Sequence, residues 1–459
     1  MPASVAWRVS EEPWMKWSEE WLDNFKIRLS AGSMGNGNVD PYSYTSEMTV
    51  VTASDIVLGG GLPSYTTVGS TVPVSLTWEK STTYDLGLDL DFLNNRLSFS
   101  GDYYRRYTTD MYTPSISLPS VYGTTSPKGN NAELRTTGWE LSFTWRDSFK
   151  LGGKPFDYSI KAMVWDNRTV VTKYENATRS LGTLKGYIQN GGSPSDFYEG
   201  MELGEMWGYT VAGLFRDQAD IDSSATHDFT QASDKVTRPG QVKIADLDHN
   251  GNIDPGAFTA DDHGDLSIIG NINPHYMFGV NLAANWNGIG LSVFLQGVMK
   301  RDWYPSPDSG YFWGKYARPF MWVLGIHNYT DDMYSEEKNN WDTAYWPRMT
   351  TYQSNSSYSW TKLLEIPNTR YKQNAAYLRV KNIQVDYTFP KALCQKIRLG
   401  GLKIYLSGEN LFTFTPLHKY APNFDPEALG YDTDFSSTAG DGYTYPVLKS
   451  VTLGVNITF

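Results

Sequence analysis

Apolar and polar residues alternate along much of the chain. In Tyr84–Phe92 the apolar residues occupy every second position, and aspartate or glycine occupies the positions between them. Residues two apart lie on the same face of a strand, so this segment predicts a strand with one apolar and one acidic face. The same period predicts strands at Trp139–Trp145, Tyr276–Trp286, Leu402–Leu406 and Val451–Phe459.

Further strands bring the total to about a dozen, each of roughly 10 residues, the length that a tilted membrane-crossing strand requires. A soluble β-sandwich also alternates, but its strands average about 5 to 6 residues and its polar face usually carries Lys, Glu and Thr. Here the polar face carries Asp, Asn, Gly and Tyr. The pattern favours an all-β fold, a transmembrane antiparallel β-barrel. The further strands are Phe25–Ser33, Arg96–Arg106, Phe156–Val171, Trp207–Phe215, Gly290–Val298 and Tyr377–Phe389.

The predicted connections alternate in length. Short turns fall at residues 94–95 and 287–289, with a modest one at 390–400, whereas long segments rich in aromatic residues, Gly and Pro occupy 108–132, 217–273, 300–375 and 413–448. Outer-membrane barrels have short periplasmic turns and long extracellular loops. Counting back from a periplasmic Phe459 places the long segments outside the cell as far as Trp207. Residues 176–197 have no clear period, so the order of strands between Val171 and Trp207 stays open.

Composition narrows the function classes. The formal charge of -11 disfavours nucleic-acid binding, which requires clustered Lys and Arg. A single cysteine, Cys394, allows no intrachain disulfide, and we expect it to be an inert buried thiol. The apolar run Pro319–Ile326 is too short for a membrane-spanning helix. Residues 1–21 lack the basic start and apolar centre of a signal peptide, so either the protein is cytoplasmic or the chain lacks its true beginning.

One segment fits the first nine positions of a calcium-binding loop. Oxygen-bearing residues occupy positions 1, 3, 5, 7 and 9, and Gly251 at position 6 permits the sharp turn. Position 12 is Ala257 instead of the expected carboxylate, so Asp261 or Asp262 would have to reach back. The alternative is a turn that satisfies itself through its own Asp and Asn side chains. The candidate Ca²⁺ ligands are Asp246, Asp248, Asn250, Asn252 and Asp254.

The long segment 300–375 is crowded with aromatic residues interleaved with Asp and Asn. Aromatic faces stack on the apolar faces of sugar rings, and carboxylates and amides bind hydroxyl groups. Trp and Tyr also form membrane girdles and pack loops, which is the commoner use of any single tryptophan. For the cluster as a whole we expect contact with a ligand or partner. The candidate substrate-binding residues are Trp303, Tyr304, Trp313, Trp322 and Trp346.

No catalytic residue is expected. Paired acids such as Asp89 and Asp91, or Asp331 and Asp332, invite a glycosidase interpretation. Neighbours in sequence are poorly placed for that chemistry, because the two catalytic acids must flank the scissile bond. The sequence contains no nucleophile elbow, P-loop or Rossmann fingerprint. We therefore predict that the chain is not an enzyme.

An ordered series of segments resembles the SusC/RagA family, the TonB-dependent transporters of Bacteroidetes outer membranes. The resemblance covers nearly the whole chain, from Leu29–Asn38 to the final strand. Its further segments are Trp78-Glu79, Leu86–Asp89, Asn95-Arg96, Asp102–Tyr104, Ala376–Lys391, Ile404–Thr415, Asp425-Pro426-Glu427, Tyr445-Pro446 and Val451–Phe459.

The resemblance implies a particular architecture. Members pair a C-terminal barrel with an N-terminal plug and a TonB-binding segment, and such barrels have 22 strands. About a dozen strands cannot complete that circle. Residues 1–459 would therefore form the C-terminal part of the barrel, with the plug absent from this chain. The terminal Phe459 would be the signal that the barrel-assembly machinery recognises.

The resemblance also implies a function and partners. The protein would be part of an outer-membrane active importer of oligosaccharides or, less often, peptides. Its partners would be a SusD-like surface lipoprotein, the TonB complex through the missing N-terminal part, and outer-membrane lipid. The alternatives are a passive porin-like channel and a soluble all-β carbohydrate-active enzyme.

Overall fold

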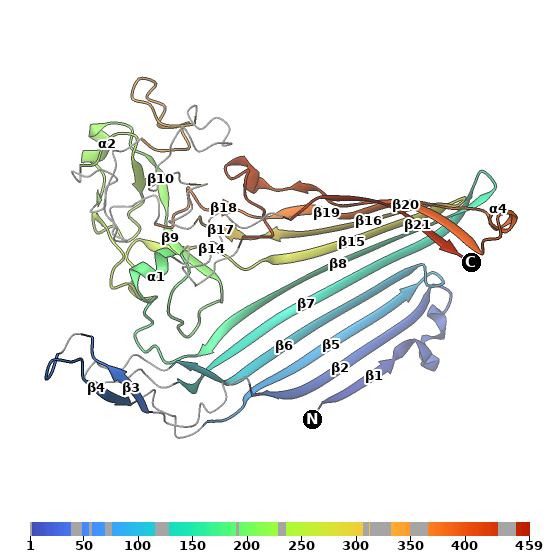
Figure 1. Ribbon diagram of the computed structural model, residues 1–459, viewed down its shortest axis with the longest axis horizontal. Helices are drawn as coiled ribbons and strands as arrows, with labels where there is room; N and C mark the ends of the chain where they lie inside the picture. The colour runs from blue at the N-terminus through green and yellow to red at the C-terminus, as the bar shows by residue number, and fades with distance from the viewer. Residues whose placement is uncertain are drawn as a thin grey trace.

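One large antiparallel sheet dominates the computed structural model (Figure 1). The structure describes residues 2–37, 48–54, 57–68, 76–114, 128–189, 192–227, 236–305, 312, 332–348, 366–429 and 447–459. The sheet has eleven strands, and each pairs with the next of them along the chain. They are β1 (Ala3–Arg8), β2 (Leu22–Asn36), β5 (Glu79–Phe92), β6 (Leu97–Pro114), β7 (Lys128–Leu151), β8 (Lys154–Lys173), β15 (His275–Trp286), β16 (Ile289–Lys300), β19 (Tyr377–Thr388), β20 (Gly401–Phe414) and β21 (Ser450–Thr458).

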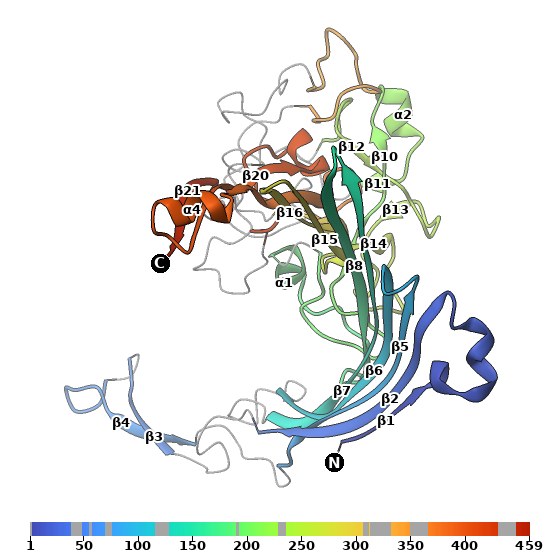
Figure 2. The same ribbon diagram turned by 90° about the vertical axis from the view of Figure 1, so that its right-hand side faces the viewer.

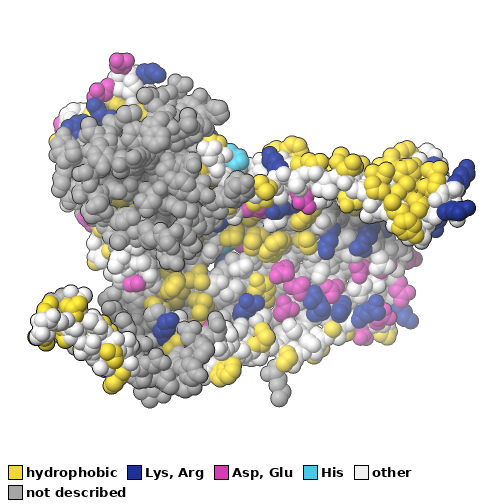
Figure 3. Space-filling view, in the orientation of Figure 1, with side chains coloured by type: hydrophobic (Ala, Val, Ile, Leu, Met, Phe, Trp, Pro, Cys, Tyr) yellow, Lys and Arg dark blue, Asp and Glu magenta, His cyan; other side chains and the backbone are white. Residues whose placement is uncertain are grey.

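The sheet is curved like a trough, with β1 and β21 at its two edges (Figure 2). Strand register gives each face one kind of side chain, because residues directly opposite each other share a face. Leu29, Leu86 and Tyr103 form one row across β2, β5 and β6 on the convex face, where the side chain of Leu86 is 49% exposed. Charged side chains gather on the concave face (Figure 3). The predicted alternation of apolar and polar faces is confirmed.

The two ends of the sheet differ as predicted. At one end, here called the turn end, the links are short: residues 93–96, 152–153 and 287–288 join successive strands. Asn94 and Asn95 both have φ near 59°, a left-handed conformation that Asn tolerates better than most residues. The longer links at this end hold α4 (Lys391–Lys396) and two short 3-10 helices, η1 (Val9–Glu11) and η2 (Pro13–Ser18).

The opposite end, here called the loop end, carries the long connections. Residues 174–274, 301–376 and 415–449 contribute to one hydrophobic core, and we call this unit the loop assembly. Its elements are α1 (Leu184–Gln189), β9 (Glu205–Tyr209), β10 (Val211–Leu214), α2 (Gln218–Asp222), β11 (Thr226–His227), β12 (Val242–Ile244), β13 (Asn252–Ile253), β14 (Leu266–Asn271), β17 (Asp302–Trp303), β18 (Gln373–Asn374) and η4 (Pro416–Lys419).

Several sequence predictions need correction at this end. The predicted sheet strand Trp207–Phe215 is wrong, because β9 pairs with β14 and β10 with β12 inside the loop assembly. All five residues of β9 are buried, so this segment has no solvent or lipid face. The connection predicted at 217–273 therefore begins at residue 174. That finding also settles the strand order between Val171 and Trp207, since the described residues between them contain no further strand of the large sheet.

Strands also extend or appear where the pattern did not predict them. β6 and β7 reach Pro114 and Lys128, which shortens the link predicted at 108–132. β1 was not predicted, nor was the hairpin of β3 (Met48–Thr52) and β4 (Ser64–Val68) in the connection between β2 and β5. Over the described ranges, no helix combines the length and the apolar character needed to cross a membrane.

Candidate functional site

The loop assembly is built around an aromatic core. Trp303 packs against Phe424 with ring centroids 4.9 Å apart, and Tyr345 stacks on Tyr420 at 3.6 Å. Each pair joins the connection 301–376 to the connection 415–449. Aromatic pairs of this kind contribute about 0.5–1.5 kcal/mol beyond the area they bury. The two connections therefore form one packed unit.

Three of the predicted substrate-binding residues lie inside this core. Trp303 and Trp346 are each 1% exposed, and Tyr304 has no exposed surface. Tyr304 donates its hydroxyl proton to the carbonyl of Ile366 at 2.9 Å. Their aromatic faces thus contact protein in this structure. Trp313 and Trp322 lie outside the described residues.

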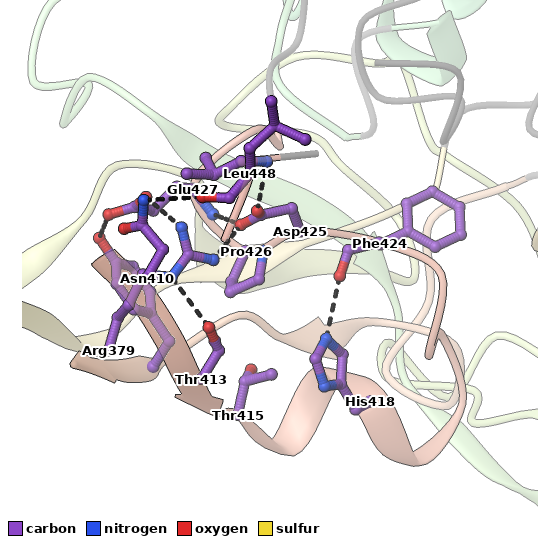
Figure 4. Close-up of polar contacts among 12 residues, drawn as sticks. Arg379, Asn410, Thr413, Thr415, His418, Phe424, Asp425, Pro426, Glu427 and Leu448 are labelled. Carbon is purple, nitrogen blue, oxygen red and sulfur yellow. Dashed lines mark hydrogen bonds and ion pairs between the residues drawn. The ribbon is translucent and has the colours of Figure 1, made fainter. Parts of the chain in front are cut away.

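A buried ionic network fastens the loop assembly to the sheet (Figure 4). Arg379 lies on β19, on the concave face and near the loop end, and its side chain is 3% exposed. Its guanidinium donates to Asp425 Oδ1 at 2.5 Å, to Thr413 Oγ1 at 2.9 Å and to a carboxylate oxygen of Glu427. A buried guanidinium needs this kind of compensation, because an unpaired buried charge is very costly.

The same acids bind other groups as well. Glu427 accepts from Lys381 Nζ at 2.8 Å and from the hydroxyl of Tyr377 at 3.0 Å. Asp425 Oδ2 accepts from the backbone N–H of Val447 at 3.1 Å. Burial on its own raises the pKa of the Asp425 carboxyl, but the backbone N–H of Glu427 and the guanidinium of Arg379 outweigh it, so the pKa lies below its ordinary value.

Sequence reasoning did not single out Arg379. The segment Asp425-Pro426-Glu427 carried part of the family resemblance, but nothing in the pattern connected its acids to one arginine 46 residues earlier. The available signal was an arginine on the polar face of a predicted strand. Only the folded loop shows which acids it meets.

The predicted calcium loop forms a compact acidic turn. Asp246 Oδ2 accepts from the backbone N–H of Gly251 at 3.0 Å, and Asp248 Oδ1 accepts from Asn250 at 3.0 Å. Gly251 has φ +85°, the conformation that its place in the loop requires. The Asx hydrogen bonds of the alternative interpretation are thus present. They leave Asp246 Oδ1 buried without a hydrogen-bond partner among the described residues.

The acid that returns to this loop is Asp265. Its two oxygens accept from the backbone N–H groups of Leu247 at 2.6 Å and Asp254 at 2.9 Å. Burial raises the pKa of this carboxyl. Ligand atoms of Asp246, Asp248 and Asp265 lie within 4.8 Å of one another. The expectation that Asp261 or Asp262 reaches back is wrong for Asp261, which pairs with Arg179, and Asp265 takes that place.

The concave face carries its own ionic network. Arg28 on β2 binds Asp89 of β5 through Nε at 2.8 Å and Asp102 of β6 at 2.9 Å. Ser100 Oγ donates to Asp89 at 2.8 Å. Farther round the sheet, Lys403 pairs with Asp386 at 3.0 Å. Of the acids that suggested a glycosidase, Asp89 is thus engaged in cross-strand pairs. Asp331 lies outside the described residues.

The chain ends at the turn end of the sheet. β21 is an edge strand, and Phe459 follows it with a side chain that is 95% exposed. Cys394 in α4 is buried as predicted.

Comparison with known proteins also points to a β-barrel. A family model described as "TonB dependent receptor-like, beta-barrel" matches residues 3–245, just over half of the chain. TonB-dependent receptor P3 of Formosa agariphila is 27% identical over 99% of this chain and 41% of its own length. TonB-dependent receptor SusC of Bacteroides thetaiotaomicron is 23% identical over 99% of this chain and 39% of its own length.

Among solved structures, the RagAB peptide transporter matches with a TM-score of 0.67 at 18% identity, over 100% of this chain and 43% of that chain. The RagAB peptide importer in its "open-open" state matches with a TM-score of 0.65 at 18% identity, over 100% of this chain and 42% of that chain. The chain therefore spans roughly two fifths of the length of these relatives.

Proposed function

Because the chain belongs to the TonB dependent receptor-like β-barrel family, we propose that it forms part of the barrel of an outer-membrane, TonB-dependent active importer of oligosaccharides or peptides. The observation that carries this proposal is the trough of eleven strands, with apolar side chains on its convex face and charged ones on its concave face. An apolar outer band and a polar interior are the requirements of a membrane barrel. The convex face would meet lipid and the concave face would line the lumen.

The loop assembly would form the extracellular end of this importer. Its aromatic core and the Arg379 network hold the connections 301–376 and 415–429 against the barrel wall. A fixed frame of loops suits a surface on which a partner docks, since rigid contacts lose less entropy on binding. We expect a SusD-like surface lipoprotein to pair with this end, in keeping with relatives named SusC and RagAB. We also expect contact with the TonB complex.

Substrate contact is proposed for the loop residues that the core does not bury. Trp313 and Trp322 keep the role assigned from the sequence. Trp303, Tyr304 and Trp346 are buried, so we assign them to the frame instead of the substrate surface.

We also propose that the acidic turn binds Ca²⁺. Asp246 Oδ1, which is buried and has no hydrogen-bond partner among the described residues, and the returning carboxylate of Asp265 fit a hard cation that prefers oxygen ligands. Asp246, Asp248 and Asp265 would hold the ion, with Asn250, Asn252 and Asp254 as the remaining candidate ligands. The ion would supply positive charge that neutralises clustered carboxylates and fixes the turn.

The function is tested with the full-length protein. Cell fractionation should place it in the outer membrane, and deleting its gene should abolish growth on one class of glycan or peptide at limiting concentration. Deleting TonB should cause the same loss. Growth that survives loss of TonB would indicate a passive channel, and a protein that is released without detergent would indicate a soluble enzyme.

A further inference from the structure

Three arginines lie together on the convex face of the sheet, about halfway along β6 and β7. They are Arg105 on β6, Arg135 on β7 and Arg168 on β8. Thr137 of β7 pairs with Arg105 on one side and with Arg168 on the other. Arg135 is two residues from Thr137 and so shares its face. Adjacent strands are about 4.8 Å apart, which puts the backbones of Arg105 and Arg168 roughly 10 Å apart.

The alternation of β6 fixes the direction of these side chains. Tyr103 and Arg105 share a face, and Tyr103 is exposed in the same row as Leu86 on the convex side. Tyr104 lies on the opposite, concave side, where a Cβ placed on Gly138 would meet its ring at 2.4 Å. All three arginines are exposed. They therefore point outward, away from the lumen.

Among the described residues, these arginines have no acidic partner. Within the part of the chain that the structure describes, no carboxylate lies at ion-pair distance from any of the three. Neighbouring acids are already engaged, because Asp166 is buried against His275 at 2.8 Å and Glu133 pairs with Lys173 at 3.7 Å. On the concave face, by contrast, Arg28 is paired with two aspartates. Three uncompensated guanidiniums on one face favour an anion from outside the chain.

The surface beside the arginines has a lining that suits a lipid. A groove of about 650 Å³ crosses β1, β2, β5 and β6, and Arg105 is among the residues that line it. Its other lining side chains on the convex face are apolar or aromatic, among them Val5, Leu29, Leu86, Tyr84, Tyr103 and Tyr107. Tyrosine and tryptophan are enriched where a membrane meets water, so Tyr84, Tyr103 and Tyr107 mark the headgroup level.

From this arrangement we propose that Arg105, Arg135 and Arg168 bind the phosphate of an outer-leaflet lipid headgroup, with an acyl chain lying in the adjoining groove. Guanidinium groups match phosphate oxygens with paired hydrogen bonds, and several basic groups together recognise phosphorylated headgroups. The apolar groove favours a lipid over free phosphate. This inference rests on the proposed outer-membrane placement, which fractionation tests separately.

The test uses the full-length transporter, purified in detergent after its outer-membrane location has been checked. The protein is titrated with phosphorylated lipid A, with the same lipid after removal of its phosphate, and with inorganic phosphate. The variant is the triple R105Q/R135Q/R168Q. The control is K391Q/K396Q/R398Q, which removes the same charge from exposed residues of the turn end.

The triple variant should bind phosphorylated lipid A about a hundredfold more weakly than the wild type, from roughly tenfold or less per basic residue. The control variant should bind it normally, and the dephosphorylated lipid should bind weakly to both proteins. Equal binding by wild type and triple variant would overturn the proposal, as would equal binding of the two lipids. Inorganic phosphate that binds as tightly as the lipid would also contradict it, because the groove would then contribute nothing. A protein absent from the outer membrane would instead contradict the proposed function.

Discussion

Arg379 and Asp425 form an ion pair of 2.5 Å in which both side chains are more than nine-tenths buried. The arginine belongs to a strand of the sheet and the aspartate to a connection of the loop assembly. The pair therefore couples the position of the loops to the barrel wall. Glu427 and Thr413 complete the set of acceptors around the guanidinium.

Arg379→Gln should release the loop from the wall. Removing one partner of a buried pair leaves the other charge uncompensated and costs about 3–5 kcal/mol. Hydrogen exchange of residues 416–429 in the full-length protein should become faster, while the strands keep their protection. Arg398→Gln at the exposed turn end should leave exchange unchanged. Unaltered protection of the loop in the Arg379 variant would show that aromatic packing alone holds it.

Acidification should release the loop from the wall, as Arg379→Gln does. The pKa of Asp425 is lower in the folded protein than its ordinary value of 3.8, so its ionic contribution is complete above that value. The contribution is lost as the pH falls through the lower, folded pKa. Pulse-labelled hydrogen exchange after equilibration at a series of pH values should show the loop opening only below about 3.8. Opening at near-neutral pH would require a different titrating group.

The sheet could be predicted from the sequence because a strand with one apolar face has an apolar residue at every second position. β5 and β21 show this period without interruption, and both have the predicted faces. β9 was misassigned because it is buried on both sides, so its apolar run carries no period that distinguishes a membrane strand from a core strand. β1 has only six residues, fewer than the roughly 10 expected of a membrane-crossing strand.

The site was less predictable than the fold. Aromatic composition identified segment 300–375 as important, but it could not separate Trp346 in a core from a tryptophan on a surface. The Asp-x-Asp-x-Asn spacing located the acidic turn, whereas the closing acid comes from Asp265, outside the spacing of the motif. Arg379 and Asp425 meet only because the loop folds back. Local patterns do not encode such long-range contacts.

The two faces of the sheet should respond oppositely to charge. Leu453→Arg places a charge on the convex face, where the leucine is 72% exposed, and Leu88→Arg does so on β5; each should cost about 2–4 kcal/mol near the bilayer midplane. Thr452→Arg is the matched control, because its neighbour across the strand is Ser407 on the concave face. Urea unfolding and assembly yield of the full-length barrel provide the measurement. Equal losses for Leu453→Arg and Thr452→Arg would refute the assignment of faces.

On the concave face, Asp89→Asn should cost little. Asp102 still pairs with Arg28 at 2.9 Å, so the guanidinium keeps one carboxylate. The structure thus refines the expectation from sequence alone, in which the change was close to neutral because Asp89 faces the lumen. We expect a loss of about 1 kcal/mol, the usual size of one exchanged hydrogen bond, in the same urea titration.

Calcium binding should depend on Asp265. Asp265→Asn removes one carboxylate from the acidic turn and should weaken Ca²⁺ binding by about tenfold or more, since ligand charge sets the affinity of such loops. Isothermal titration of the full-length protein measures it. Asp261→Asn is the control, because that residue lies nearby but pairs with Arg179. If neither Asp265→Asn nor Asp246→Ala changes the titration, the segment is a self-satisfied turn.

The tryptophans of segment 300–375 should separate into two groups. Trp346 packs on Phe312 and Tyr371, each with ring centroids 5.5 Å away, and is 1% exposed. Trp346→Ala should therefore destabilise the loop assembly by about 3–5 kcal/mol, as for other buried tryptophans, and accelerate its hydrogen exchange.

Trp313→Ala with Trp322→Ala should instead weaken substrate capture. Single losses of stacking amount to about 1 kcal/mol, so the double variant is the informative one. Growth on the cognate glycan or peptide at limiting concentration should fall, while the amount of protein in the outer membrane and the hydrogen exchange of the loop assembly stay at wild-type levels. Normal import by the double variant would mean that these two tryptophans pack or anchor the loops, and that substrate is captured by other residues. Slower import accompanied by faster exchange would place them in the frame with Trp346.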